Sequence, residues 1–128
     1  MRVFERPGPI NTNEIIKIVR EKSTLAKYVV VASITGESAI KVAQNSPKNT
    51  IACVTCPQGM YWETDQMEKD IFNDIPELKD IRDKWVQEGL HRVPMNITEE
   101  NRVILNKLNV TIVQGTIPFF GPSAPIPN

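Results

Sequence analysis

The pattern of apolar positions opens with a helix that leads into a strand. Ile15, Ile18 and Val19 fall on one face of a helix, and Ile16 widens that face. The run 28–32 that follows is continuously apolar and rich in valine, which is typical of a parallel strand covered on both faces. We therefore expect an amphipathic helix that feeds a buried strand.

The same alternation continues through two more strands. A helix is expected after Gly36, and residues 50–56 predict a second strand, so that strand, helix and strand form one right-handed βαβ unit. Thr98, followed by two glutamates, begins another helix. Asn109 is suited to a left-handed C-cap, and residues 110–115 predict a third strand. This order predicts an α/β fold, a three-layer α/β/α sandwich with a mainly parallel sheet.

The rest of the chain has a less regular pattern. We expect a short edge strand at 2–5, helices at 67–72 and 76–88, and a proline-rich irregular tail at 116–128. Three or four strands make a small sheet, so an open edge could pair with a partner, such as a second copy of the chain. The whole chain, residues 1–128, is expected to be one domain.

Composition narrows the classes of partner. Fifteen basic and fifteen acidic residues cancel, which gives no electrostatic reason to expect nucleic acid or an anionic membrane. The longest apolar runs are far shorter than the roughly 20 residues that span a bilayer. Charged residues stand where a signal peptide needs its apolar stretch, so a cytoplasmic location is expected.

Cys53 and Cys56 are the two cysteines, and they have CxxC spacing. A redox CxxC lies at a helix start, and a structural zinc site needs four ligands. This pair lies in or just after a predicted strand, and His91 is the one histidine of the chain. The sequence favours two partly buried thiols, so no metal site is expected. His91 has no partner at a known motif spacing, so no catalytic residue is assigned.

A small polar turn follows the first predicted strand and holds Ser33, Thr35, Gly36, Glu37 and Ser38. Ligands of open α/β sheets bind at the carboxyl ends of the strands, and the N–H groups and dipole of a helix N-terminus attract anions. A glycine lets the backbone approach a ligand closely. The turn therefore predicts either a phosphate site or a helix cap made by serine or threonine, and both interpretations stay open.

Five further residues could form the rim of such a site. Thr55 and Gly59 follow the second strand and Thr116 follows the third, which places them at the same edge of the sheet. Asn11 and Thr12 begin the first helix, where they could contact an anion or form an ordinary capping box.

Three motifs resemble those of the stand-alone pyruvate kinase C-terminal-domain-like proteins. Residues 4–12, FERPGPINT, are similar to the F-x-x-P-G-x-x-N-T start of that family, and residues 30–39 are similar to its V-V-A-S-x-T-G-x-[ST]-A turn. Residues 95–116 resemble its third helix and strand. The resemblance leaves out about 61–93, an expected insertion. It implies the fold of the pyruvate kinase C-terminal domain, a phosphate held at the turn, and flavin mononucleotide (FMN) as a candidate cofactor.

Two departures from the family pattern narrow this expectation. Ile34 and Glu37 stand where the turn of pyruvate kinase has basic residues. Glu37 suits the helix dipole but would repel a second phosphate, so one phosphate is expected. The family also continues past the third strand with a glycine-rich second half, so the chain resembles a short or truncated member.

The sequence thus favours a small-molecule-binding module that holds a phosphorylated ligand, FMN or a sugar or nucleotide phosphate, at the strand, turn and helix 29–43. Tyr61 and Trp62, with two phenylalanines of the tail, could stack on a flavin ring or close a core. One alternative is an enzyme that uses the ligand, with Glu37 and Lys41 as polar acid–base candidates. Another is a module that assembles through its open sheet edge.

Overall fold

The computed structural model describes residues 3–66 and 75–115, and the chain divides into two compact units. The first unit combines Met1–Ile15 with Tyr61–Pro94, and the second combines Ile16–Met60 with Met95–Asn128. The sequence predicts one domain with an insertion at about 61–93. In the structure this segment has its own paired strands and helix, and it groups with the N-terminal residues.

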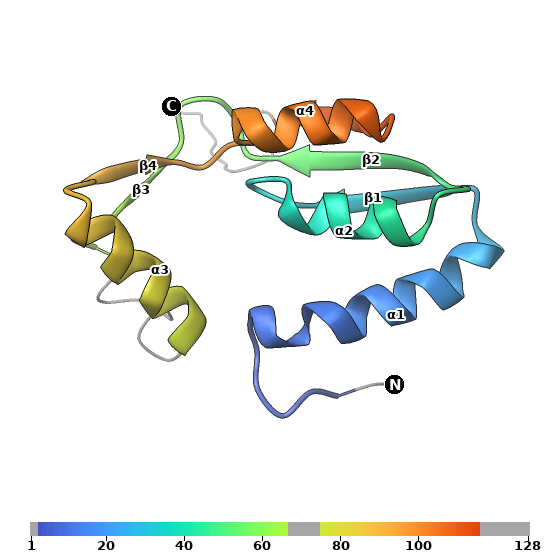
Figure 1. The fold of residues 1–128 in the computed structure, drawn as a ribbon, viewed down its shortest axis with the longest axis horizontal. Helices are drawn as coiled ribbons and strands as arrows, with labels where there is room; N and C mark the ends of the chain where they lie inside the picture. The colour runs from blue at the N-terminus through green and yellow to red at the C-terminus, as the bar shows by residue number, and fades with distance from the viewer. Residues whose placement is uncertain (1–2, 67–74, 116–128) are drawn as a thin grey trace, which may run out of the picture. The chain divides into compact units, whose positions relative to one another are not determined.

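The second unit contains a parallel sheet of three strands. They are β1 (Tyr28–Ala32), β2 (Thr50–Thr55) and β5 (Thr111–Gln114), and they pair in the order β1-β2-β5 with β2 in the centre (Figure 1). Both pairings are parallel. The predicted α/β character and mainly parallel sheet are confirmed, and β1 and β5 are the edge strands of this sheet.

Three helices accompany these strands. The helix α1 (Thr12–Lys22) lies between two short 3-10 helices, η1 (Pro9–Asn11) and η2 (Ser23–Leu25), and leads into β1. The helix α2 (Glu37–Asn45) joins β1 to β2, and α4 (Glu99–Lys107) precedes β5. This order is the one that the apolar pattern predicts.

The predicted ends of α4 are confirmed, and α1 begins at Thr12, directly after Asn11, as the sequence predicts. Thr98 Oγ1 accepts a hydrogen bond of 3.2 Å from the Asn101 amide, and Asn109 has a left-handed φ of 59°. Asn11, expected as an N-cap, lies inside η1, and its Nδ2 donates to the Arg6 carbonyl oxygen at 2.6 Å. Its side chain holds the preceding loop.

One face of the sheet carries the core of the second unit. Ile16 of α1, Val42 of α2 and Leu105 of α4 all contribute to the same apolar cluster, so the three helices share this face. Leu105 and Cys53 are its largest fully buried side chains. The buried members of the cluster are Ile16, Ala39, Val42, Ala43, Ile51, Cys53, Ile97, Leu105 and Val110.

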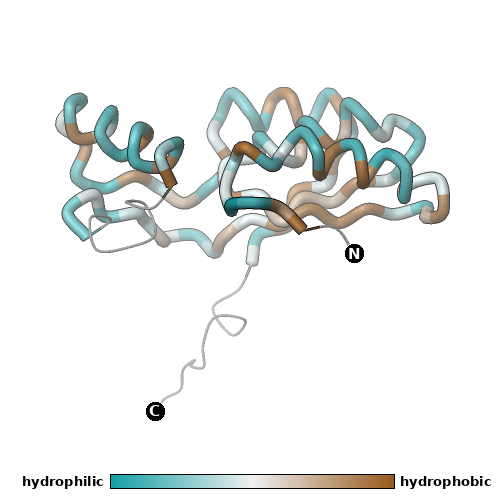
Figure 2. Tube along the Cα trace, turned by 90° about the horizontal axis from the view of Figure 1, so that it is seen from below, coloured by the Kyte–Doolittle hydropathy of each residue, from teal (hydrophilic) through white to brown (hydrophobic). Residues whose placement is uncertain are grey.

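The opposite face of the sheet is exposed, although its strands are apolar (Figure 2). Val30 is 70% exposed and Val113 is 45% exposed. Among the described residues the sheet therefore has helices on one face, and the predicted third layer is not present there. The sequence suggested coverage on both faces because residues 28–32 are apolar throughout, but the described part of the chain supplies helices for one face.

The first unit contains an antiparallel strand pair that the sequence does not predict. β3 (Tyr61–Glu63) pairs with β4 (Arg92–Pro94), and α3 (Pro76–Gln87) lies between them in the chain. The helix expected at 76–88 is confirmed. Residues 3–5 form no strand, so the edge strand expected there is wrong for that part. The helix expected at 67–72 and the tail at 116–128 lie outside the described residues.

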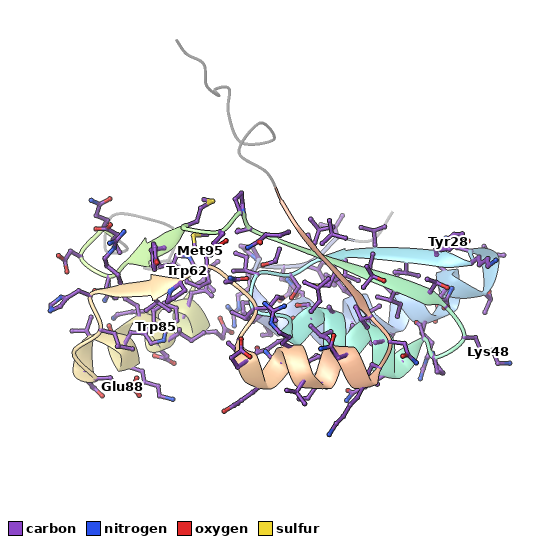
Figure 3. All side chains as sticks on the ribbon, turned by 90° about the horizontal axis from the view of Figure 1, so that it is seen from above. Tyr28, Lys48, Trp62, Trp85, Glu88 and Met95 are labelled. Carbon is purple, nitrogen blue, oxygen red and sulfur yellow. The ribbon has the colours of Figure 1, made fainter. Side chains whose placement is uncertain are left out.

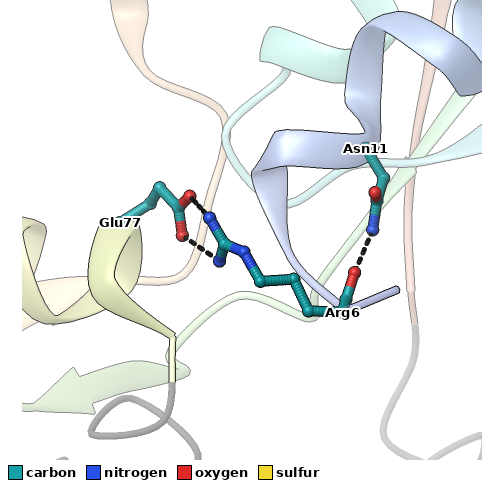
Figure 4. Close-up of polar contacts among 3 residues, drawn as sticks. All are labelled: Arg6, Asn11 and Glu77. Carbon is teal, nitrogen blue, oxygen red and sulfur yellow. Dashed lines mark hydrogen bonds and ion pairs between the residues drawn. The ribbon is translucent and has the colours of Figure 1, made fainter. Parts of the chain in front are cut away.

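Within the first unit an ion pair joins Arg6 to Glu77 of α3. The guanidinium donates to the two carboxylate oxygens at 2.7 and 3.2 Å (Figure 4). The hydrogen bonds from Arg6 hold the pKa of Glu77 below its ordinary value of 4.5. Both side chains are partly solvated, so the pair is expected to contribute modestly to stability.

The lowered pKa of Glu77 predicts the direction of a pH effect. Its stabilising contribution is fully present above the ordinary carboxyl pKa and is lost as pH falls through the lowered folded-state value. Glu77→Gln should therefore lower the urea midpoint at about pH 7, and its difference from the wild type should vanish by about pH 2. Asp80→Asn, on the exposed part of the same helix, is the control. An equal loss for Glu77→Gln at both pH values would contradict this assignment.

Candidate functional site

The polar turn lies between β1 and α2, at the carboxyl end of the parallel sheet. Gly36 is the N-cap of α2 and has a left-handed φ of 101°, a conformation that L side chains rarely adopt. No side chain caps α2, although the sequence offered serine and threonine for this role. The helix begins at Glu37, which follows the glycine directly.

Hydrogen bonds fasten the turn to β2. The Ser33 amide donates to the Val54 carbonyl oxygen at 3.0 Å, and Thr55 Oγ1 donates to the Ile34 carbonyl oxygen at 2.7 Å. Ser33 Oγ accepts from the Gly36 amide at 3.2 Å. Thr55 thus lies beside the turn, as its place at the end of β2 predicts. Its single hydroxyl proton is used in the hydrogen bond to Ile34, so Thr55 Oγ1 has no proton left to donate to a ligand.

The region around the start of α4 covers the other side of the turn. Asn101 Nδ2 donates to the Thr35 carbonyl oxygen at 2.9 Å, and the Thr98 amide approaches the same oxygen at 3.4 Å. A β-carbon at Gly36 would lie 3.0 Å from Leu105 Cδ1 and 3.3 Å from Ile97 Cδ1. Sequence reasoning did not find these contacts. They give Gly36 a packing role, because α4 fits against its bare backbone.

Glu37 and Ser38 are the exposed part of the turn, and they belong to the first turn of α2. The dipole of α2 favours negative charge at this point, and Glu37 itself already supplies one. Lys41 follows one helical turn later and is also exposed. The groups of the turn that a ligand can reach are therefore the first N–H groups of α2, the Ser38 hydroxyl and the Glu37 carboxylate.

Gly59, another of the expected rim residues, lies in the loop between β2 and β3. Gly59 has a left-handed φ of 90°, and nothing would touch a β-carbon there within 4 Å. Asn11 and Thr12 belong to the first unit and the turn belongs to the second. Thr116 lies outside the described residues. Thr55 is thus an expected rim residue that has a hydrogen bond to the turn.

Tyr61 and Trp62, two of the aromatic residues expected to stack on a flavin, have partners within the first unit, and the two phenylalanines of the tail lie outside the described residues. The ring centroids of Trp62 and Trp85 are 5.5 Å apart with an interplanar angle of 32° (Figure 3). The Arg92 guanidinium lies over the Tyr61 ring, 4.4 Å from its centroid. These contacts fit the interpretation in which the aromatic side chains close a core.

Cys53 and Cys56 are both buried and free. Burial raises the pKa of the Cys53 thiol, which makes its reactive thiolate form scarce. Its Sγ lies 3.7 Å from the Ser33 carbonyl oxygen. The burial of both thiols fits a structural role for the pair, which is the interpretation that the sequence favours. Among residues 3–66 and 75–115, no group of three or more His, Cys, Asp or Glu side chains is placed to hold a metal ion.

Comparison with known proteins identifies no family for this chain. The sequence matches no protein-family model, and no solved structure is significantly similar to it. In the described part of the chain, the helices are all too short or too polar to cross a membrane.

Proposed function

We propose that the chain is a small-molecule-binding module that holds one phosphate group of its ligand at the N-terminus of α2. The observation that carries this proposal is the uncapped start of α2, where Gly36 is the N-cap and no side chain accepts from the first-turn N–H groups. Such N–H groups, aligned with the helix dipole, form an anion site at the sheet edge where α/β proteins bind ligands.

The geometry narrows the residues that would hold the phosphate. Ser33 and Thr55 are engaged within the turn, so the proposed contacts are the first N–H groups of α2 and the Ser38 hydroxyl. Glu37 lies in the same helical turn and limits the site to a single phosphate, because a second one would meet its carboxylate. The resemblance to pyruvate kinase C-terminal-domain-like proteins supports the same position.

FMN is one ligand that this proposal allows. Its phosphate suits the start of α2, whereas Tyr61 and Trp62 already contact Arg92 and Trp85 in their own unit. The phosphate is the part of FMN that the described residues fit. A sugar phosphate or a nucleoside monophosphate meets the same requirement.

The test is a calorimetric titration of the purified protein with FMN, ribose 5-phosphate and adenosine monophosphate. Ser38→Asp adds a carboxylate that the helix dipole tolerates, so it should keep the thermal midpoint and weaken phosphate binding about tenfold or more. Glu37→Gln removes repulsion and should strengthen binding by up to about fivefold. Gln44→Glu, exposed near the other end of α2, is the matched control. The absence of binding by all three ligands, or equal affinities for wild type and Ser38→Asp, would refute the proposal.

A further inference from the structure

A cavity lies at the amino ends of β1 and β2, at the opposite end of the sheet from the turn. Its volume is about 500 Å³, within the range of small-molecule sites. Tyr28 and Lys48 mark this end of the second unit in Figure 3. The lining residues come from the end of α1, from η2 and from the loop after α2: Arg20, Ser23, Thr24, Ala26, Asn45, Ser46, Pro47, Lys48 and Asn49.

The charges that line this cavity are all positive. Arg20 and Lys48 are its two charged residues, and no carboxylate is among the lining side chains. Neither cation has a hydrogen bond or an ion pair with another described side chain. Two unpaired cations on one concave surface raise the local concentration of anions.

Side chains already satisfy several backbone carbonyl groups at this end of α1. Ser23 Oγ donates to the Arg20 carbonyl oxygen at 2.9 Å, and Asn49 Nδ2 donates to the carbonyl oxygens of Ser23 and Ala26 at 3.1 and 2.6 Å. These bonds reduce the exposed negative ends of the carbonyl dipoles, which would otherwise oppose an anion. They also leave hydroxyl and amide oxygens as acceptors for hydroxyl groups of a ligand.

Ser46 is a buried residue of the cavity wall. It is 4% exposed, it lines the cavity, and its Oγ has no hydrogen-bond partner among the described residues. A buried hydroxyl without a partner is destabilising, and such groups are rare in folded proteins. The Ser46 Oγ is closed to solvent, so Ser46 forms part of the cavity wall and does not contact a ligand there.

We propose that this cavity is a second binding site, for a small anion that carries hydroxyl groups, of the size of a sugar phosphate or a sugar acid. Arg20 and Lys48 bind the anionic group, and Asn45 and Asn49 bind the hydroxyl groups. The site is separate from the start of α2. The residues that line the cavity lie at the ends of α1 and α2, before β1 and β2, whereas the turn lies after β1.

The experiment titrates the full chain with glucose 6-phosphate and with gluconate, and with uncharged glucose as the ligand control. Heteronuclear NMR should show shifts at residues 20–26 and 45–49 for the anions and none for glucose. Combined Arg20→Ala and Lys48→Ala substitutions should weaken binding about tenfold or more. Lys107→Ala, which removes an exposed charge outside the cavity, should leave the affinity unchanged. Binding of one anion alone identifies the source of the charged group, phosphate or carboxylate.

Ser46→Ala is a control for the cavity wall. It should keep or raise the thermal midpoint, because it removes an unsatisfied buried hydroxyl, and it should leave the affinity for the anion unchanged. Ser38→Asp should leave binding at this cavity unchanged, so failure of the site at α2 is distinguished from failure here. The proposal is overturned if no shifts appear at 20–26 and 45–49, or if the combined charge removal leaves the affinity unaltered.

Discussion

Leu105→Ala is expected to lower the free energy of unfolding by about 3–4 kcal/mol. Leu105 is 0% exposed and belongs to the apolar cluster that α1, α2 and α4 form on the sheet. Truncation removes buried methyl groups and leaves a cavity that the surrounding helices and strands fill only in part. Urea unfolding followed by far-UV circular dichroism measures the loss.

Val103→Ala is the matched control on the same helix. Val103 is 52% exposed, so its truncation should cost less than about 1 kcal/mol. A loss of similar size for the two substitutions would show that α4 does not pack on the sheet as described.

Gly36→Ala is expected to lower the free energy of unfolding by about 2–4 kcal/mol, for two reasons that add. The φ of 101° strains any residue with a β-carbon. The new methyl group would also lie 3.0 Å from Leu105 Cδ1 and 3.3 Å from Asn101 Cβ, so the start of α4 would have to move. Thermal and urea unfolding of the purified variant measure the effect.

Gly59→Ala separates the two reasons. Gly59 has a similar left-handed φ of 90°, but nothing would contact a β-carbon there within 4 Å. Its substitution should therefore cost about 1–2 kcal/mol, from the backbone alone. If the two variants lose equal stability, the packing of α4 on Gly36 makes no contribution.

This double role of Gly36 changes how the phosphate proposal should be tested. A bulky or charged residue at Gly36 would disturb the contacts with α4 whether or not a ligand binds the turn. Lost binding in such a variant would then report lost folding. Ser38 avoids this problem, because it is exposed on the first turn of α2.

The parts of the fold that local signals determine are predicted from the sequence. The strand at 28–32, the start of α2 after Gly36 and the Thr98 cap of α4 each depend on a few neighbouring residues, and the structure has all three. The pair β3 and β4 was missed because each strand has three residues, too few to show alternation, and Pro94 ends one of them. Strands that short are recognised only once they are paired.

The candidate site divides in the same way. The place of Thr55 beside the turn follows from the topology of parallel strands, so it could be predicted. The hydrogen bond from Asn101 to Thr35 could not, because it depends on how α4 packs across the turn and leaves no pattern in the spacing of residues. The cavity at the amino ends of the strands joins residues of α1 and α2 through packing in the same manner.

The pairing of β2 has a consequence for the order in which the strands associate during synthesis of the chain. Tyr28 of β1 pairs with Thr50 of β2, across α2 alone, whereas Ala52 pairs with Thr111 only after the segment that joins the first unit has been synthesised. Closing the longer loop costs more entropy, so we expect β1, α2 and β2 to associate first and β5 to join last. Until β5 leaves the ribosome, the nascent chain carries a valine-containing strand with one open edge, the kind of surface that chaperones and neighbouring nascent chains bind.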